Sequence, residues 1–500
     1  MKKREWDLLK AWLVEHDAID EDIVCAEAIT RLDLSSRGIE ELPENFGLLN
    51  KLVALNLSTN RLSFLPDSLS ELSNLNNLDI RRNRFEILPD VIAKLSIRSL
   101  NASGNKIKDV SILKNAKELR VLDLSSNAIG SLKRFLPISN ELRTLNLSCN
   151  LIKEIDGFVE YLRSVERLNL SSNVIETIPS GVSALESIVE LDLSSNKIRT
   201  IDSAFFDLEM ETLDLSSNNL KTLNLFSLES LEELNLDENG FESLTIEDYF
   251  APYLREFSCE SCNLKEFLLP PSESIELLCY SSNEISEIPQ EVGKYAKMLQ
   301  LDVDGNRIAN LPDSLANLIY LQTLYIGGNP LSEESKKIIA VLSPNICDLN
   351  MKSGITIEVA KKNDLEEMAL LLSALFAIEK DFKIDYDKQL SGITKLHESG
   401  GADMLVAKHE DKVVGMVTMQ RLISSAEGDY VGQIEDLVVQ EEYRKMGVGS
   451  RLINKMRSVA QEYGYKRIQL AADADNANAL QFYNRRGFNK TNLNLYHYKV

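Results

Sequence analysis

Apolar and polar residues follow a long-range pattern over the first two thirds of the chain. Leucine-type residues recur at positions 1, 4 and 6 of each unit and an asparagine at position 9, as in Leu52, Leu55, Leu57 and Asn60. Fourteen such units follow one another at spacings of 21–23 residues, between about residues 29 and 331. One unit cannot bury its leucines alone, so stacked units must share a continuous core. The pattern predicts a solenoid with a parallel sheet on its concave side.

This unit resembles the leucine-rich repeat, in which the asparagine turns inward and hydrogen-bonds backbone groups of the tight turn. The ninth positions are Arg37, Asn60, Asn83, Asn105, Asn127, Asn150, Asn173, Asn196, Asn218, Asn239, Cys262, Asn283, Asn306 and Asn329. Both ends of a solenoid expose apolar core and need caps. We expect a helical N-terminal cap over residues 1–28 and a capping helix over 331–343.

The repeat stops before Ile355, and alternating strand and helix signals begin. The sequence predicts an α/β protein in three parts: the cap 1–28, the solenoid 29–352 and a mixed α/β domain 353–500. Within the last part, Val431 begins a strand that leads into a turn with Arg444-x-x-Gly447-x-Gly449 and then an amphipathic helix. Backbone N–H groups at such a helix start favour an anion, and the two glycines allow close approach. The turn is therefore a candidate pyrophosphate cradle.

The turn and a later segment, Asn476-x-x-Ala479-x-x-Phe482-Tyr483, together resemble the GNAT superfamily of acetyl-CoA-dependent N-acetyltransferases over about residues 353–500. The resemblance implies acetyl-CoA as cosubstrate and an amine as acceptor. It further implies that the strand before the turn binds the pantetheine arm with backbone groups and that the turn binds the pyrophosphate. The cosubstrate-binding residues that it implies are Leu437, Val438, Val439, Arg444, Lys445, Met446, Gly447, Val448, Gly449, Ser450 and Asn476.

Two residues are candidates for the chemistry. The Glu435-Asp436 stretch is similar to that of polyamine-type members, in which the glutamate draws a proton from the amine, and Tyr483 would protonate the leaving thiolate. Strict alternation places Glu435 and Leu437 on one face of the strand and Asp436 on the other, so Asp436 is the second choice. The alternatives are that Glu435 is a solvated strand residue and Tyr483 a core tyrosine. We expect no metal.

Charge and cysteine content limit the classes of partner and the cellular location to be expected. The net charge is −22, of which −1 lies in residues 353–500 and −21 in residues 1–352. This acidity argues against nucleic acid or an anionic membrane as partner. Six cysteines do not make a disulfide framework, and no secretory or membrane-spanning segment is expected, so we predict a cytoplasmic protein. Cys259 and Cys262 occupy repeat positions and are interpreted as packing residues.

Charged side chains on the predicted concave face change sign along the arm. The basic ones are Arg31, Arg81, Arg82, Arg98, Arg120, Arg143 and Arg167; the acidic ones are Glu190, Glu211, Glu232, Glu233, Asp237, Glu238, Glu256, Glu260 and Glu276. A solvated sheet face needs no such segregation, so the face is a candidate surface for a protein partner. The functional prediction is an N-acetyltransferase with a recognition arm. The alternative is an interaction scaffold whose acetyltransferase domain senses acetyl-CoA or is inactive.

Overall fold

The computed structural model describes residues 2–132, 140–342, 346, 348–350, 355–376, 385–424, 429–444, 448–472, 477–484 and 488. The chain divides into two compact units, Met1–Ile285 with Pro289–Met298, and Ser286–Ile288 with Leu299–Val500. This division falls within the repeats. The three boundaries expected from the sequence remain predictions.

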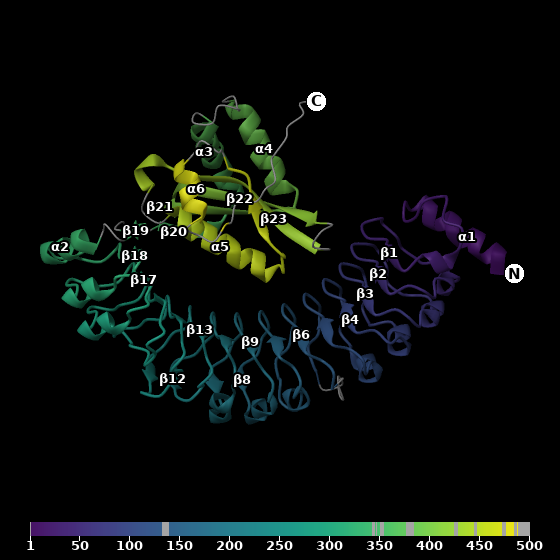
Figure 1. Ribbon diagram of the computed structural model, residues 1–500, viewed down its shortest axis with the longest axis horizontal. Coiled ribbons are helices and arrows are strands. Elements are labelled where there is room, and N and C mark those ends of the chain that lie inside the picture. Colours follow the sequence, from purple (N-terminus) through teal and green to yellow (C-terminus); the bar gives the residue numbers. More distant parts are fainter. Residues whose placement is uncertain are drawn as a thin grey trace. The chain divides into compact units, whose positions relative to one another are not determined.

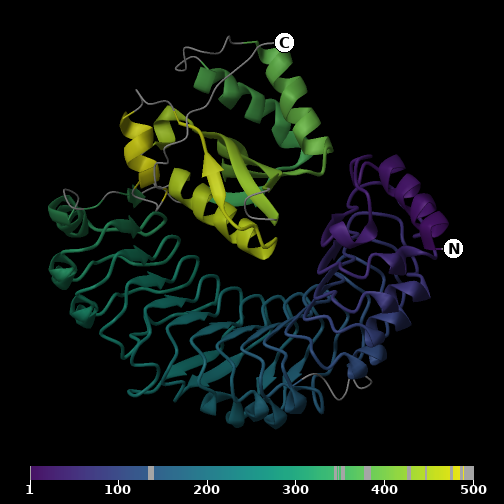
Figure 2. The same cartoon turned by 45° about the vertical axis from the view of Figure 1, so that its right-hand side comes forward.

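Each of the fourteen repeats contributes one short strand to a parallel sheet of 15 strands. The middle residue of each strand is a buried apolar residue of the repeat core, such as Leu168 or Leu191. In the first unit the strands line the inner side of a curved stack (Figure 2). The strands of the sheet are β1 Arg31–Asp33, β2 Ala54–Asn56, β3 Asn77–Asp79, β4 Ser99–Asn101, β5 Val121–Asp123, β6 Thr144–Asn146, β7 Arg167–Asn169, β9 Glu190–Asp192, β11 Thr212–Asp214, β13 Glu233–Asn235, β15 Glu256–Ser258, β16 Leu277–Cys279, β17 Gln300–Asp302, β18 Thr323–Tyr325 and β19 Asp348–Asn350.

The return path of most repeats is a short 3-10 helix, on the outer side of the stack in Figure 1. These helices span Ala26–Ala28, Phe46–Leu48, Asp67–Glu71, Asp90–Lys94, Ser111–Asn115, Val159–Tyr161, Ser180–Ala184, Ser203–Asp207, Gln290–Lys294 and Asp313–Asn317. Proline often precedes the helix, as Pro179 does before Ser180–Ala184, because its fixed φ suits the turn. Two additional pairs of parallel strands lie on the return path, β8 Thr177–Ile178 with β10 Thr200–Ile201, and β12 Thr222–Leu225 with β14 Ser243–Ile246.

The inward asparagines hold neighbouring repeats together, as predicted. Asn173 donates from Nδ2 to the carbonyl oxygens of Leu147, Leu170 and Ser171 at 3.0–3.1 Å, and its Oδ1 accepts the Ile152 N–H at 2.9 Å. One side chain thus satisfies buried groups of two repeats, which would otherwise destabilise the turn. At Cys262 the thiol donates to the Leu236 oxygen at 3.1 Å, whereas the Phe241 N–H bonds the Cys262 carbonyl instead. Cys259 and Cys262 are buried, which supports their interpretation as packing residues.

The Asp and Asn side chains at the fifth repeat position point along the concave face and are used by their own turns. Asp192 Oδ1, for example, accepts the backbone N–H of Ser194 at 3.0 Å and its hydroxyl at 2.7 Å. In the eleventh repeat Ser258 replaces this residue. Asp237 of the preceding repeat takes over its function and accepts the Ser258 hydroxyl and the Glu260 N–H, both at 2.7 Å. The Asp and Asn residues at the fifth repeat position therefore stabilise the turns.

Asp237 is the carboxylate of the arm that burial affects most clearly. Burial, followed by the charge of Glu260, raises its pKa from 3.8 to about 7. A carboxyl group whose pKa is raised on folding stabilises the fold when protonated, and this contribution is lost as the pH rises from about 4 to about 7.

Replacing Asp237 by asparagine should stabilise the arm at pH 8. The amide oxygen keeps both accepted hydrogen bonds while the buried charge disappears, so the free energy of unfolding should rise by about 2 kcal/mol at pH 8 and change much less at pH 5. Urea unfolding of the full chain at both pH values measures this difference. The control is Glu211→Gln, which removes a charge from an exposed position of the same face. An unchanged or lowered midpoint of Asp237→Asn at pH 8 would contradict the assignment.

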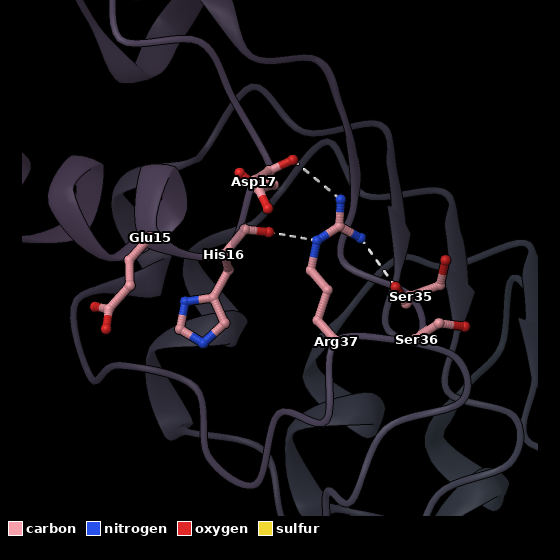
Figure 3. A pocket seen from close by; sticks show the side chains of 6 residues that line it. All are labelled: Glu15, His16, Asp17, Ser35, Ser36 and Arg37. Atoms are coloured by element: carbon pink, nitrogen blue, oxygen red, sulfur yellow. Dashed lines mark hydrogen bonds between the residues drawn. The ribbon is translucent and has the colours of Figure 1, made fainter.

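A helix covers the N-terminal end of the stack. Helix α1, Lys2–Glu15, buries Leu9 and Leu13 completely. It is shorter than the expected cap, because the chain turns at Asp17 (φ 49°) and the short 3-10 helix Ala26–Ala28 follows before β1. Arg37, which stands where other repeats have asparagine, ties this turn to the first repeat. Its guanidinium donates to the carbonyl oxygens of His16, Asp17 and Ser35 around an open pocket of about 420 Å³ (Figure 3).

The expected C-terminal capping helix is present as α2, Glu333–Leu342, with Ser332 at its start accepting the Ser335 N–H at 3.2 Å. Beyond it, strand β19 pairs in parallel with β18. The repeat pattern of the sequence does not indicate this additional strand. The last strand of a solenoid leaves backbone groups unpaired, and β19 satisfies those of β18.

The C-terminal sheet has five strands in the order β20-β21-β22-β23-β24: Ile355–Val359, Ala402–His409, Lys412–Ser424, Asp429–Val439 and Ile468–Leu470. Only the last pair is parallel. Helices α3, Leu365–Phe376, and α4, Tyr386–Glu398, cover one face, and their core includes Val406, Met416 and Val438. Helix α5, Val448–Glu462, covers the other face, where Phe482 of α6, Ala477–Asn484, also packs (Figure 1).

Candidate functional site

The sheet opens at the middle of β23. Strand β24 pairs with β23 only from Gly432 to Ile434. On the other side of β23, the pairing with β22 shifts by one residue, because Thr418 lies opposite Asp436 while Met419 lies opposite Ile434. Glu435 is the extra residue of this bulge. A bulge bends and twists its strand, so β23 separates from β24 directly after Ile434.

The backbone of β23 beyond the bulge presents hydrogen-bonding groups at this opening. The Gln440 N–H donates to the oxygen of Val414, its direct neighbour on β22, at 2.9 Å. Since bonding alternates along an antiparallel strand, Val438 also faces β22, whereas Leu437 and Val439 direct their N–H and C=O groups toward the open side. In agreement, the Val439 oxygen accepts a hydrogen bond from Nε of Arg444 at 3.0 Å.

The turn after β23 is fastened to the β21–β22 hairpin. Its 3-10 helix, Glu441–Tyr443, follows Gln440, whose side-chain amide donates to the Val413 oxygen at 3.1 Å. The Tyr443 hydroxyl and His409 Nδ1 are hydrogen-bonded at 3.0 Å. No sequence motif singles out this pair, because the two residues lie 34 positions apart. The contact of His409 with Tyr443 fixes the direction in which the chain enters the glycine-bearing turn.

Helices α5 and α6 meet at Gly449, in the first turn of α5. A Cβ atom at this position would lie 3.2 Å from two ring carbons of Phe482 and 3.8 Å from Cγ2 of Val439. The glycine therefore lets α6 approach both the helix start and the open strand. Next to Phe482 lies Tyr483, whose ring contacts Phe482 and Phe488 with centroids 5.3 and 5.8 Å apart.

The structure thus brings together Leu437, Val438, Val439, Arg444, Val448, Gly449 and Tyr483. The start of α5 includes Ser450 as well. Lys445, Met446, Gly447 and Asn476 lie outside the described residues.

The two acidic residues of β23 have different surroundings. Glu435 is exposed at the bulge, and the alternation expected to pair it with Leu437 is interrupted there. Asp436 accepts a hydrogen bond from the hydroxyl of Thr418 at 3.0 Å, and Thr418 is completely buried. Sequence reasoning missed Thr418, since only the pairing of β22 with β23 reveals it. The carboxylate of Glu435, where β23 separates from β24, and that of the adjacent Asp436 can both attract a cation.

Three acidic residues, Glu379, Asp381 and Asp385, precede α4 in the sequence. Asp385 caps this helix by accepting the Lys388 N–H at 3.2 Å, so part of its role is structural. Glu379 and Asp381 lie outside the described residues. Across the described ranges, His, Cys, Asp and Glu form no group of three or more that could hold a metal ion. Likewise, no helix in these ranges has the length and apolar character that a membrane crossing requires.

Comparison with known families assigns both parts of the chain. The acetyltransferase (GNAT) family matches residues 370–488, which contain the open strand, the turn and α6. The leucine-rich-repeat family matches residues 140–198 and 186–241. The chain joins leucine-rich repeats to a GNAT acetyltransferase domain. The GNAT domain is of the acetyl-CoA-dependent class.

Individual relatives resemble one part of the chain or the other. An uncharacterized N-acetyltransferase of Methanocaldococcus jannaschii is 26% identical over 212 residues, covering 40% of this chain and 89% of that protein. N-acetyltransferase 8 of Homo sapiens is 31% identical over 103 residues, covering 20% of this chain and 45% of that protein. The chain thus spans less than half of the human relative. A leucine-rich-repeat protein of Leptospira interrogans shares the fold, with a TM-score of 0.54 at 24% identity, over 64% of this chain and 83% of that chain.

Proposed function

We propose that the protein transfers an acetyl group from acetyl-CoA to a primary amine of a small molecule or a protein lysine, and that its arm holds a protein partner. The observation that carries the proposal is the opening of the sheet at the Glu435 bulge, which leaves backbone groups of Leu437 and Val439 facing away from β22. Amine-dependent release of the CoA thiol tests it.

In this proposal the pantetheine arm lies along the open side of β23. Its amide groups would pair with the backbone of Leu437 and Val439 as an added strand does. The pyrophosphate would lie at the start of α5, bound by backbone N–H groups of residues 445–450. Arg444 would hold the entry of this turn through its bond to the Val439 oxygen, and Asn476 would contact the pantetheine arm. Gly449 at the start of α5 lies close to Phe482 of α6 and to Val439 of β23. This proximity supports one site formed by α5, α6 and β23.

Glu435 is the proposed base and Tyr483 the proposed acid. Glu435 would take a proton from the ammonium group, directly or through water, and the free amine would attack the thioester carbonyl. The backbone N–H of Leu437, which faces the open side of β23, would stabilise the oxyanion. When the carbon–sulfur bond breaks, Tyr483 would give its phenolic proton to the thiolate. The nitrogen would lose its second proton, through water, to the tyrosinate, so that the products are an amide and free CoA. The exposed position of Glu435 supports a role toward an acceptor that arrives from solvent.

The proposed partner surface of the arm is the concave face of the acidic repeats. Ion pairs between repeats already neutralise several arginines of the basic stretch: Arg120 with Glu141 and Arg143 with Glu166, both at 3.4 Å, and Arg167 with Glu190 at 2.8 Å. In the acidic stretch, Glu211 and Glu233 are exposed and make no ion pair within the described part of the chain. Glu232 and Glu276 share Arg255, at 3.5 and 3.1 Å, so Glu211 and Glu233 supply the unpaired negative charge that favours a cationic partner segment.

Reversing three acidic residues should weaken binding of a cationic peptide more than reversing three basic ones. We expect Glu211→Lys, Glu233→Lys and Glu256→Lys together to reduce the affinity of a terminally blocked deca-arginine peptide by about tenfold at low salt, since the attraction is electrostatic. This peptide offers no amine to acetylate. Reversal of Arg98, Arg120 and Arg143 to glutamate is the matched control and should not weaken binding. Equal affinities of all three proteins across a salt series would identify the face as a solvated surface.

The six cysteines, of which the described ones are free thiols, support the proposal of a cytoplasmic protein.

A further inference from the structure

Arg451, in the first turn of α5, carries a buried donor without a partner. The side chain is partly buried, and its Nη1 atom is shielded from solvent and has no hydrogen-bond partner among the described residues. Buried polar groups of folded proteins nearly always have a partner, and a buried unpaired donor costs about 1–3 kcal/mol, more when it is charged. The described residues therefore offer this nitrogen no acceptor, and a bound group with an oxygen acceptor would relieve that cost.

The position of Arg451 places such a group near the start of α5. Side chains of a helix lean toward its N-terminus, so an arginine in the first turn extends toward the N-terminal end of α5. At about 100° per residue, Arg451 lies about 200° around the helix from Gly449, which faces Phe482. Val448 and Leu452 point into the core beneath. Arg451 thus flanks the helix start on a side other than the one that α6 covers.

The chemistry of such a group follows from the donor. A guanidinium presents planar N–H groups that match the oxygens of phosphate and carboxylate, and it stays charged at any physiological pH. The helix start itself favours an anion through its unpaired N–H groups and its dipole. The two features point to the same ligand, a phosphate group. Arg444, which opens the turn, uses its Nε on the Val439 oxygen.

We propose that Arg451 is a cosubstrate-binding residue whose guanidinium binds a phosphate group of acetyl-CoA. The proposal rests on the proposed function, because it requires acetyl-CoA at the start of α5. It adds a side-chain contact to the backbone contacts that the glycine-bearing turn offers. Arg451 would thereby let the protein distinguish acetyl-CoA from acyl thioesters that lack the nucleotide.

The experiment compares Arg451→Gln with the full-length wild-type chain. Calorimetry should show acetyl-CoA binding weakened by about 10- to 100-fold, as expected for a lost hydrogen bond to a charged group. With S-acetylpantetheine, which has no phosphate, kcat/KM should stay within about twofold of the wild type. The thermal midpoint of the ligand-free variant should not fall, since the ligand-free protein loses no hydrogen bond of Nη1. The matched control is Arg457→Gln, at an exposed position of the same helix, which should bind acetyl-CoA normally.

Each possible outcome decides the question. Unchanged affinity of Arg451→Gln for acetyl-CoA would overturn the proposal, as would an equal loss with S-acetylpantetheine or a lowered thermal midpoint, both of which indicate a structural role. Calorimetry with 3′-dephospho-acetyl-CoA separates the two phosphate sources. If Arg451→Gln binds this compound more weakly than the wild type does, the ligand of Arg451 is the pyrophosphate. If the two proteins bind it equally, the ligand is the 3′-phosphate. If the wild-type chain itself does not bind acetyl-CoA, the proposed function fails.

Discussion

Tyr483→Phe should lower kcat by about 100-fold and leave the KM for acetyl-CoA nearly unchanged. The missing hydroxyl matters only when the thiolate leaves, and general acid catalysis contributes at least about this factor. The phenylalanine ring keeps the contacts of the tyrosine ring with Phe482 and Phe488, so the site should stay intact. Steady-state thiol release at varied acetyl-CoA concentrations measures both constants.

Tyr463→Phe is the matched control for this variant, because Tyr463 lies just beyond the C-terminal end of α5 and is 51% exposed. It should keep the wild-type kcat. If Tyr483→Phe also keeps it, the proton reaches the thiolate from another group and Tyr483 is a core tyrosine.

Gly449→Glu should abolish measurable acetyl-CoA binding, a loss of at least about 100-fold. The new Cβ would lie 3.2 Å from ring carbons of Phe482, so that this ring must shift by a few tenths of an ångström, and the carboxylate would repel phosphates at the helix start. Gly449→Ala brings the Cβ without the charge and should cause a smaller loss. Calorimetry with acetyl-CoA measures both variants.

The matched control for Gly449→Glu is Gly392→Glu. Gly392 also lies in a helix, α4, but a Cβ there meets no atom within 4 Å. This variant should bind acetyl-CoA as the wild type does. Equal binding by Gly449→Glu and the wild type would show that acetyl-CoA does not use the start of α5.

The repeats were predictable from the sequence because their structure is determined locally. Each leucine and asparagine has its role fixed by its position in the repeat, as the hydrogen bonds of Asn173 to Leu170 and Ser171 of its own turn illustrate. What the sequence could not reveal depends on neighbouring repeats. The pairing of Arg143 with Glu166, for example, connects two repeats and changes the expected basic face into a largely neutralised one.

In the GNAT domain the sequence indicated the residues that follow one another in a motif, such as Gly449 and Tyr483. It could not indicate the bulge at Glu435, because a bulge is a property of the pairing between two strands. For the same reason the hydrogen bonds of Thr418 with Asp436 and of His409 with Tyr443 were not foreseen. Arg451 stood in the motif region but looked like an ordinary helix residue until its buried, unpaired nitrogen was seen.

The most direct test of the central claim is the rate of CoA thiol release from acetyl-CoA by the full-length chain, with and without primary amines. The amines should include polyamines and lysine-containing peptides. The account predicts release that depends on the amine, forms the acetylated amine in equal amount and disappears in Gly449→Glu. A chain that binds acetyl-CoA but releases no thiol with any of these amines would contradict it and would favour an acetyl-CoA sensor on an interaction scaffold.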